Sequence, residues 1–207
     1  MDDVSRETFD RTLFAAHFDV SRETLAHFDT YAELLVEWQQ RMNLVGPASL
    51  DQVWHRHFAD SAQLVALGRA PWLDLGAGAG FPGLVIALLG GGPIALVEAT
   101  GKKADFLEAV VAATGLADVT IRRERIEAAV APPSATIVAR ACASLTQLFD
   151  WGLHLAGSQT RWVLPKGARH GEEIATARTT FEFDHHLEPS LTDASARIVI
   201  ASNVRRR

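Results

Sequence analysis

The 207-residue sequence predicts an α/β fold, with a mostly parallel sheet, an antiparallel C-terminal hairpin and additional N-terminal helices. Three observations predict this architecture. Residues 21–42 carry apolar side chains at helical spacing, short apolar runs alternate with amphipathic stretches after Pro71, and two final strand-like runs have no helix between them. We therefore divide the chain into an N-terminal helical extension, residues 1–69, and an α/β domain, residues 70–207.

Two helices are predicted in the N-terminal extension. Ser21 is a suitable N-cap for the first, whose apolar face consists of Leu25, Phe28, Ala32, Leu35, Val36 and Met42. The second is predicted to begin at Ser49, because Ser49 and Gln52 have the spacing of a capping box, and to end near Ala66.

The α/β domain has five predicted parallel strands and four predicted helices. The strands are Trp72–Leu75, Ile94–Glu98, Val119–Arg123, Thr136–Ala139 and Trp162–Leu164. The helices between and after them are Gly83–Leu89, Lys102–Thr114, Leu145–Ala156 and Glu172–Arg178. Because such connecting helices cover both faces of a parallel sheet, its strands are almost entirely apolar. Phe181–Leu187 and Arg197–Ala201 are expected to form an antiparallel hairpin at one sheet edge.

Composition excludes several classes of protein. A hydrophobic content of 48% excludes extensive disorder, and the single cysteine, Cys142, excludes a disulfide framework or a cysteine-based zinc site, so we expect no metal. The acidic N-terminus does not resemble a secretory signal. The uncharged stretch Leu75–Val97 is interrupted by glycine and proline, which break a membrane-spanning helix. We expect a cytoplasmic monomer without a membrane partner.

The net charge of −5 argues at first against a nucleic-acid partner. However, residues 1–30 hold seven acidic and three basic side chains, a net charge of −4, so that residues 31–207 sum to −1. The body of the chain can therefore still present a basic face.

A glycine-rich segment follows the first predicted strand, Trp72-Leu-Asp74-Leu-Gly76-Ala-Gly78-Ala-Gly80-Phe81-Pro82-Gly83. Gly76, Gly78 and Gly80 permit close approach of the backbone to a ligand, and Glu98 ends the next strand, where a carboxylate can accept hydrogen bonds from ribose hydroxyls. The G-x-G-x-G spacing differs from the G-x-G-x-x-G of dinucleotide sites. Asp74 suits an ammonium and sulfonium ligand better than a pyrophosphate, so the segment favours S-adenosylmethionine as cofactor.

The sequence at this point resembles the bacterial ribosomal RNA small subunit methyltransferase G family, also called glucose-inhibited division protein B. The resemblance is carried, in order, by Arg41-Met-Asn43-Leu-Val, Arg56-His57-Phe-Ala-Asp60-Ser61, Leu73 to Gly83, Gly101-Lys102-Lys103 with Phe106-Leu107, Arg125-Ile126-Glu127, Ala139-Arg140-Ala141 with Ala143-Ser144-Leu145, and Lys166-Gly167. The glycine loop alone indicates only a class I methyltransferase. The segments around Asp60 and Arg140 are more specific.

The resemblance implies a Rossmann-like class I S-adenosylmethionine-dependent methyltransferase domain over residues 70–207. It implies transfer of a methyl group to N7 of a guanine in the 530 loop of 16S ribosomal RNA, either as RNA or in the small ribosomal subunit. It also implies that Gly76 and Phe81 line the cofactor, that Ile126 and Glu127 flank the adenine, and that Arg140 lies between cofactor and substrate as a catalytic residue. N7 carries a lone pair and no proton, so in-line transfer needs no general base.

Basic residues are predicted at the carboxyl-end rim of the sheet. Lys102 and Lys103 open a helix just after Glu98, and Lys166 follows a strand, so we expect these three lysines to contact RNA. Arg140 stands in an apolar run and requires a partner, for which Glu98 and Glu127 are candidates. Phe81 is expected to be exposed to the ligand, and His57 is either a cleft residue or a structural one.

Two other functions remain open at this stage. A nicotinamide-dependent oxidoreductase would also use Glu98 on a ribose, although the glycine spacing and Asp74 argue against it. A non-catalytic RNA-binding module could retain the fold, although it would have no need of the intact glycine loop.

Overall fold

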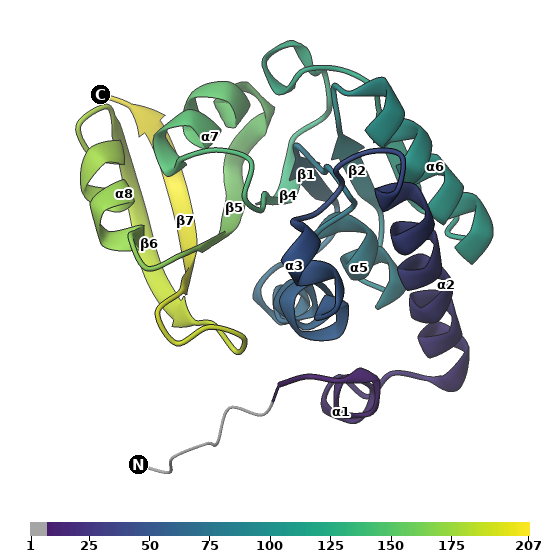
Figure 1. Ribbon diagram of the computed structural model, residues 1–207. Coiled ribbons are helices and arrows are strands. Elements are labelled where there is room, and N and C mark those ends of the chain that lie inside the picture. The colour runs from purple at the N-terminus through teal and green to yellow at the C-terminus, as the bar shows by residue number, and fades with distance from the viewer. Residues whose placement is uncertain (1–7) are drawn as a thin grey trace.

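The computed structural model describes residues 8–207, which are built around one seven-stranded sheet (Figure 1). The strand order is β3-β2-β1-β4-β5-β7-β6. The strands are β1 (Trp72–Leu75), β2 (Ile94–Val97), β3 (Val119–Arg122), β4 (Ser134–Val138), β5 (Ala156–Lys166), β6 (Phe181–Pro189) and β7 (Arg197–Arg206). The first five are parallel, and β7 is inserted antiparallel between β5 and β6. The predicted fold class and its C-terminal hairpin are confirmed.

Short helices connect and precede these strands. They are α1 (Arg11–His17), α2 (Arg22–Gln39), α3 (Pro47–Leu50), the π-helical segment η1 (Val53–Ala59), α4 (Asp60–Ala62), the single turn η2 (Val65–Leu67), α5 (Gly83–Leu88), α6 (Gly101–Thr114), the turn η3 (Ile126–Ala128), α7 (Leu145–Gly152), the turn η4 (Leu153–Leu155) and α8 (His170–Ala177). Across residues 8–207, no helix combines the length and the hydrophobicity that a membrane crossing requires.

Side-chain alternation along the strands divides the core into two clusters. In β1, Trp72 packs with the apolar faces of α2, α5 and α6, whereas Leu73 and Leu75 pack with α7 and α8 on the opposite face. Figure 1 shows the two groups of helices on opposite sides of the sheet. Because successive strand residues point to opposite faces, Asp74 shares the face of Trp72, beneath α5.

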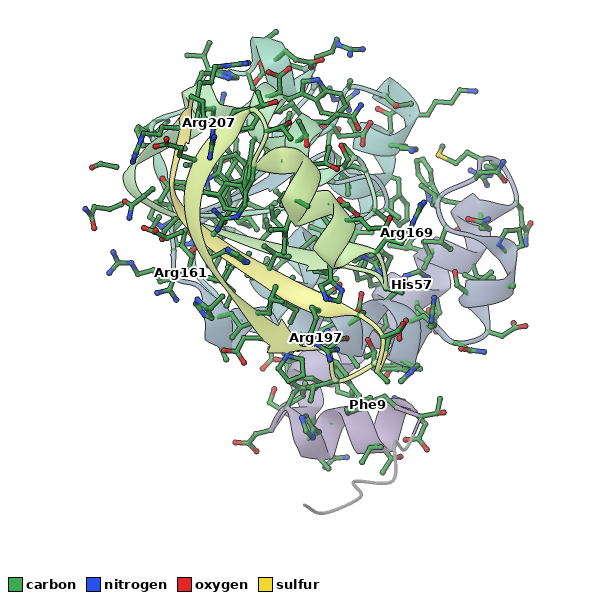
Figure 2. All side chains as sticks on the ribbon, turned by 90° about the vertical axis from the view of Figure 1, so that its left-hand side faces the viewer. Phe9, His57, Arg161, Arg169, Arg197 and Arg207 are labelled. Atoms are coloured by element: carbon green, nitrogen blue, oxygen red, sulfur yellow. The ribbon has the colours of Figure 1, made fainter. Side chains whose placement is uncertain are left out.

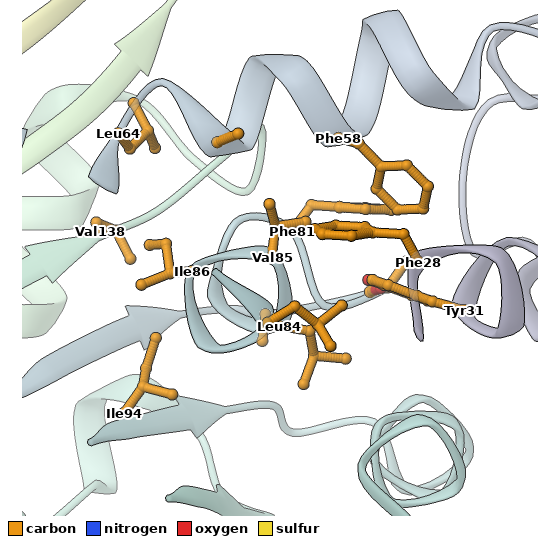
Figure 3. Packing of buried hydrophobic residues seen from close by; sticks show 14 of the residues in the cluster. Phe28, Tyr31, Phe58, Leu64, Phe81, Leu84, Val85, Ile86, Ile94 and Val138 are labelled. Atoms are coloured by element: carbon orange, nitrogen blue, oxygen red, sulfur yellow. The ribbon is translucent and has the colours of Figure 1, made fainter. Parts of the chain in front are cut away.

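The N-terminal helices share their core with the α/β domain. Phe28 and Tyr31 of α2 and Phe58 of η1 are fully buried in the same cluster as Phe81 and Leu84 (Figure 3). Each of these aromatic rings removes a large apolar area from water, and their mutual contacts add further stabilisation. Residues on both sides of the predicted boundary at residue 69 therefore stabilise one another.

The predicted N-cap of α2 is confirmed, because the Ser21 hydroxyl oxygen accepts a hydrogen bond from the Thr24 amide at 3.1 Å. The predicted helix from Ser49 to Ala66 is wrong. Pro47 begins α3 two residues earlier, since proline suits the first helical turn, and the segment is then broken into α3, η1, α4 and η2. The Ser49 hydroxyl consequently donates to the Gly46 carbonyl instead of capping a helix.

A first prediction concerns Gly80, whose φ of +88° and tight surroundings both oppose a side chain. A Cβ at this position would lie 2.5 Å from Leu84 Cδ1 and 2.6 Å from Tyr31 Oη. We expect Gly80→Ala to lower the free energy of unfolding by about 3 kcal/mol, from backbone strain and overpacking together.

Gly90→Ala is the matched control, because its φ is +73° but no atom lies within 4 Å of an added Cβ. This variant is expected to lower the free energy of unfolding by about 1 kcal/mol, from backbone strain alone. Chemical denaturation of both variants measures the difference, and equal losses would show that the contacts of Gly80 contribute nothing.

Candidate active-site cleft

The carboxyl ends of the parallel strands open into a cleft of about 1240 Å³. Its walls come from the glycine loop after β1, Glu98 after β2, the segment Arg140–Ser144 after β4, residues of η1 and α4, and the connection between β6 and β7. Strand order reverses direction between β1 and β4, and open α/β sheets bind ligands at such a reversal. The cleft is therefore the candidate active site.

Two of the three predicted glycines lie at the cleft. Gly76 and Gly78 line it with φ of +69° and +57°, a conformation that favours glycine. A Cβ on Gly78 would meet only the Gly76 carbonyl oxygen, at 3.8 Å, so the space over Gly78 is open to a ligand. Gly80 faces the core instead and supports the loop from behind.

Glu98 lies where the sequence predicts, at the cleft just beyond β2. Its carboxylate accepts hydrogen bonds from the Gly78 amide at 2.9 Å and from the Thr100 amide at 2.7 Å. These bonds hold the carboxylate in one orientation and leave lone pairs on both oxygens. Glu98 is therefore preoriented to accept further hydrogen bonds from a ligand.

The structure corrects the expected placement of Asp74. Its side chain is fully buried, does not line the cleft, and accepts a hydrogen bond through Oδ2 from the Gly83 amide at 2.8 Å. Burial raises the pKa of the Asp74 carboxyl to about 7. Strand alternation explains the difference, because Asp74 points to the sheet face that α5 covers. Asp74 Oδ2 thus holds the first residue of α5, and Oδ1 is buried with no hydrogen-bond partner among the described residues.

Ile126 and Glu127, for which the resemblance implies adenine contacts, follow β3 at the same edge of the sheet. Ile126 is buried next to the glycine loop, with Cδ1 3.9 Å from a Cβ built on the cleft residue Gly76. The Glu127 carboxylate pairs with Arg125 at 3.0 Å on the surface. Neither side chain is among those that line the cleft.

Arg140 reaches the cleft two residues beyond β4 and is held by three acceptors. Its guanidinium donates to the Arg56 carbonyl at 2.9 Å, to Asp60 Oδ2 at 3.3 Å and to His57 Nδ1 at 2.8 Å. It also lies over the Phe81 ring, 4.9 Å from the centroid. The acidic partner of Arg140 is therefore Asp60, and the expectation of Glu98 or Glu127 is wrong.

Phe81 is the centre of an aromatic stack. Its ring lies 5.3 Å from that of Tyr31 and 4.8 Å from that of His57, at angles of 18° and 17°. The Tyr31 hydroxyl donates to the Ala79 carbonyl at 2.5 Å and fixes the loop from the α2 side. Phe81 lines the cleft but is only 4% exposed, so the expectation of an exposed ring is wrong.

His57 is a cleft residue with both ring nitrogens engaged. Because a guanidinium can only donate, Nδ1 accepts from Arg140, and Nε2 therefore carries the proton and donates to Ser49 Oγ at 2.9 Å. Burial, Arg140 and Arg56 lower the pKa of His57 to about 3. The imidazole is thus neutral at physiological pH, and its only acceptor atom is occupied.

The three lysines predicted to contact RNA have different environments. Lys103 lines the cleft, and Lys102 is exposed outside it. Lys166 also lines the cleft, but its ammonium donates to the Ala143 carbonyl at 2.8 Å and pairs with Glu173 at 3.0 Å. The Lys166 ammonium therefore stabilises the loop after β4 with two of its three N–H donors.

Several cleft residues were not predicted from the sequence. Arg169 and Arg197 add positive charge to the cleft that His57 also lines, and Arg197 does so as the first residue of β7 (Figure 2). Tyr31 packs against Phe81, and Asp60 pairs with Arg140. Asp60 lies in the H-x-x-D-S segment, which is the signal in the sequence that could identify it as the partner of Arg140. No local pattern indicates the role of Tyr31, since it occupies an ordinary apolar position of α2.

Comparison with known proteins agrees with this geometry. Residues 24–199 match the sequence profile described as rRNA small subunit methyltransferase G. A protein of Methylorubrum extorquens named Ribosomal RNA small subunit methyltransferase G is 43% identical, with 95% of this chain and 96% of the relative covered. A relative of the same name from Rhodospirillum centenum is 42% identical over 95% of this chain and 92% of its own length.

The chain belongs to the rRNA small subunit methyltransferase G family.

Solved structures show the class I methyltransferase fold that members of this family are expected to have. A ribosomal protein L11 methylase from Lactobacillus delbrueckii subsp. bulgaricus has a TM-score of 0.56 and 16% identity, covering 79% of this chain and 81% of its own. An O-methyltransferase from Bacillus cereus in complex with SAH has the same TM-score and identity, covering 84% and 91%. The family and the fold together make this chain a methyltransferase.

The neutral state of His57 generates a prediction about pH. Folding lowers the pKa of His57, so protonation of this side chain favours the unfolded chain. The contribution of neutral His57 to the free energy of unfolding is therefore complete above pH 6.5 and is lost as pH falls toward about 3. His57→Gln retains a neutral polar side chain without this titration. Between pH 7 and pH 4.5, wild type should lose about 2–3 kcal/mol more unfolding free energy than the variant. Urea denaturation at several pH values measures this, and parallel pH profiles would contradict a depressed pKa.

Proposed function

We propose that this protein transfers a methyl group from S-adenosylmethionine to N7 of a guanine in the 530 loop of 16S ribosomal RNA. The observation that carries the proposal is one continuous cleft, which joins the open glycine loop and Glu98 to Arg140 and a cationic rim. The names of the relatives from Methylorubrum extorquens and Rhodospirillum centenum support small-subunit ribosomal RNA as the substrate class.

The residues at the β1–β2 end of the cleft fit S-adenosylmethionine. The space over Gly78 is open, and Glu98 retains lone pairs that can accept from ribose hydroxyls. The O-methyltransferase from Bacillus cereus, which shares the fold, is described in complex with SAH. A volume of about 1240 Å³ exceeds that of an ordinary small-molecule pocket, which leaves room for a nucleobase beside the cofactor.

The cleft residues are suited to alignment rather than to proton transfer. When bound, S-adenosylmethionine supplies an electrophilic methyl group, and guanine N7 offers its lone pair without losing a proton. His57 is neutral with both nitrogens engaged, Lys166 is paired, and Asp74 is buried, so none of these groups is free to act as a base. This arrangement supports in-line transfer without a general base.

Arg140 is the cleft residue best placed to meet the substrate. Three of the five N–H donors of its guanidinium are engaged by Arg56, Asp60 and His57, which leaves two for a ligand. Those donors can hydrogen-bond a phosphate or the O6 atom of a guanine. A guanidinium held by three acceptors and an aromatic ring is already oriented before the substrate binds, and we therefore assign Arg140 as a catalytic residue.

The RNA contacts are proposed at Lys103, Arg56, Arg169 and Arg197, which all line the cleft. We retain Lys102 as a peripheral contact, because it lies beside Lys103 at the start of α6. Lys166 acts indirectly in this proposal, by holding the Arg140–Ser144 segment through Ala143. With a net charge of −5 over the chain, non-specific attraction to RNA is weak, and recognition depends on the shape of the target.

The cofactor contact is tested by Glu98→Gln. Loss of the carboxylate charge should reduce affinity for S-adenosylmethionine about tenfold in calorimetric titration, because a charged acceptor binds hydroxyl donors more strongly than an amide. Glu108→Gln is the matched control, since Glu108 is exposed outside the cleft, where it pairs with Arg123, and it should bind normally. Equal effects of the two substitutions would contradict the assigned position of the ribose, and binding of NADH in place of S-adenosylmethionine would overturn the cofactor.

The reaction is tested by incubating the protein with S-adenosylmethionine and either 16S ribosomal RNA or small ribosomal subunits, then mapping 7-methylguanosine. A new 7-methylguanosine in the 530 loop is expected, and Arg140→Ala should slow its formation at least a hundredfold, as for the loss of a preorganised charged donor. Methylation elsewhere would overturn the proposed target. Binding of RNA without any transfer would favour a non-catalytic module.

A further inference from the structure

The connection between β6 and β7 crosses to the N-terminal helices at the cleft. The Leu191 amide donates to Gln63 Oε1 at 2.9 Å, and the Thr192 hydroxyl donates to Asp60 Oδ1 at 2.7 Å. The partners in these bonds are separated by 128 and 132 residues in the sequence, and Thr192 and Asp60 both line the cleft. The β6–β7 connection is thus hydrogen-bonded to both ends of α4, whose first residue, Asp60, pairs with Arg140.

Asp60 is shared between these two attachments. Its Oδ1 atom accepts from the Thr192 hydroxyl at 2.7 Å and from Gln63 Nε2 at 3.1 Å, and its Oδ2 atom accepts from Arg140 at 3.3 Å. The side chains of Asp60 and Arg140 are only 21% and 16% exposed, so solvent screens their interaction weakly. The carboxylate that pairs with Arg140 is therefore oriented through its other oxygen, by the Thr192 hydroxyl together with the longer bond from Gln63.

The backbone of Thr192 is held as well. The Phe9 amide donates to His55 Nδ1 at 3.2 Å, so His55 carries its proton on Nε2 and donates it to the Thr192 carbonyl at 3.1 Å. Figure 2 shows Phe9 below the hairpin turn that contains this connection. Thr192 is consequently fixed through both its carbonyl and its hydroxyl by segments from the beginning of the chain.

We propose that Asp60 is a positioning residue for Arg140, and that Thr192, in the β6–β7 connection, helps to orient the Asp60 carboxylate. The inference rests on the proposed function, because it assigns to the far end of the chain a role in the alignment of the transfer step. Removal of the Thr192 hydroxyl leaves only the longer bond from Gln63 on Asp60 Oδ1. The carboxylate is then held less firmly, and Arg140 samples orientations in which its remaining donors miss the substrate.

Thr192→Val tests this with little change in shape, and Thr192→Ser restores the hydroxyl. We expect kcat for methyl transfer to fall about three- to tenfold in Thr192→Val and to recover to within twofold of wild type in Thr192→Ser. KM for S-adenosylmethionine should stay within twofold, because neither Thr192 nor Asp60 hydrogen-bonds to Glu98 or to the glycine loop. Asp60→Asn, which loses the charge opposite Arg140, should lower kcat more than tenfold.

Ser195→Ala is the control on the same connection. The Ser195 hydroxyl donates only to Asp193, within the connection, and Ser195 does not line the cleft. This variant should transfer methyl groups at the wild-type rate. If it loses as much activity as Thr192→Val, the hydroxyls merely maintain the folded connection and the proposal is overturned.

A double-mutant cycle separates positioning from a general structural effect. In an Arg140→Lys background, where the geometry of the guanidinium is already lost, Thr192→Val should lower the remaining kcat by less than twofold. An undiminished effect in that background would mean that Thr192 acts independently of Arg140, and would overturn the inference.

A spectroscopic measurement keeps the test separate from the proposed function. The ¹H–¹⁵N signal of Arg140 Nε, assigned by its loss in Arg140→Lys, should shift in Thr192→Val and return in Thr192→Ser. An unchanged signal in Thr192→Val contradicts the positioning role even if wild type is active. Conversely, the Arg140 signal can shift in Thr192→Val while the wild-type protein transfers no methyl group to RNA. That result would overturn the proposed function and leave the coupling of Thr192, Asp60 and Arg140 intact.

Discussion

The stacking of Phe81 between α2 and η1 is the contact on which the arrangement of the cleft depends. Phe81 belongs to the glycine loop, whereas its neighbours Tyr31 and His57 belong to the N-terminal helices. An aromatic pair contributes about 0.5–1.5 kcal/mol beyond the area that it buries, and Tyr31 adds a hydrogen bond to the loop carbonyl of Ala79. The same rings place His57 where it accepts from Arg140. The loop, the helices and the guanidinium are therefore oriented by one packed cluster.

Much of the fold could be predicted from the sequence, because its signals are local. Alternating apolar runs and amphipathic stretches indicated each parallel strand and the hairpin, and Ser21 indicated the start of α2. The segment from Pro47 to Leu67 could not be predicted, because its π-helical and single-turn pieces are stabilised by tertiary packing of Phe58 and its neighbours. A helix that depends on distant aromatic partners leaves no periodic pattern of its own.

The sequence predicted the cleft residues whose place is fixed by the backbone. It predicted less well the side chains whose place depends on pairing with another side chain. Gly76, Gly78 and Glu98 lie at the cleft because strand ends and turns fix them. Asp74 could have been assigned to the interior by counting strand alternation from Trp72. The pairing of Lys166 with Glu173, and that of Arg140 with Asp60, join segments that only the folded sheet brings together. The sequence shows the charges but not their partners.

The insertion of β7 between β5 and β6 has a consequence for the order in which the cleft can form during synthesis. β7 follows β6 along the chain, yet it provides the hydrogen-bonding partner for both of its neighbours. Until β7 emerges from the ribosome, β5 and β6 have exposed edges, and the connection that carries Thr192 has no second strand to anchor it. The glycine loop and the N-terminal helices can pack earlier. A nascent chain can therefore complete the end of the cleft at the glycine loop well before the end formed by the β6–β7 connection.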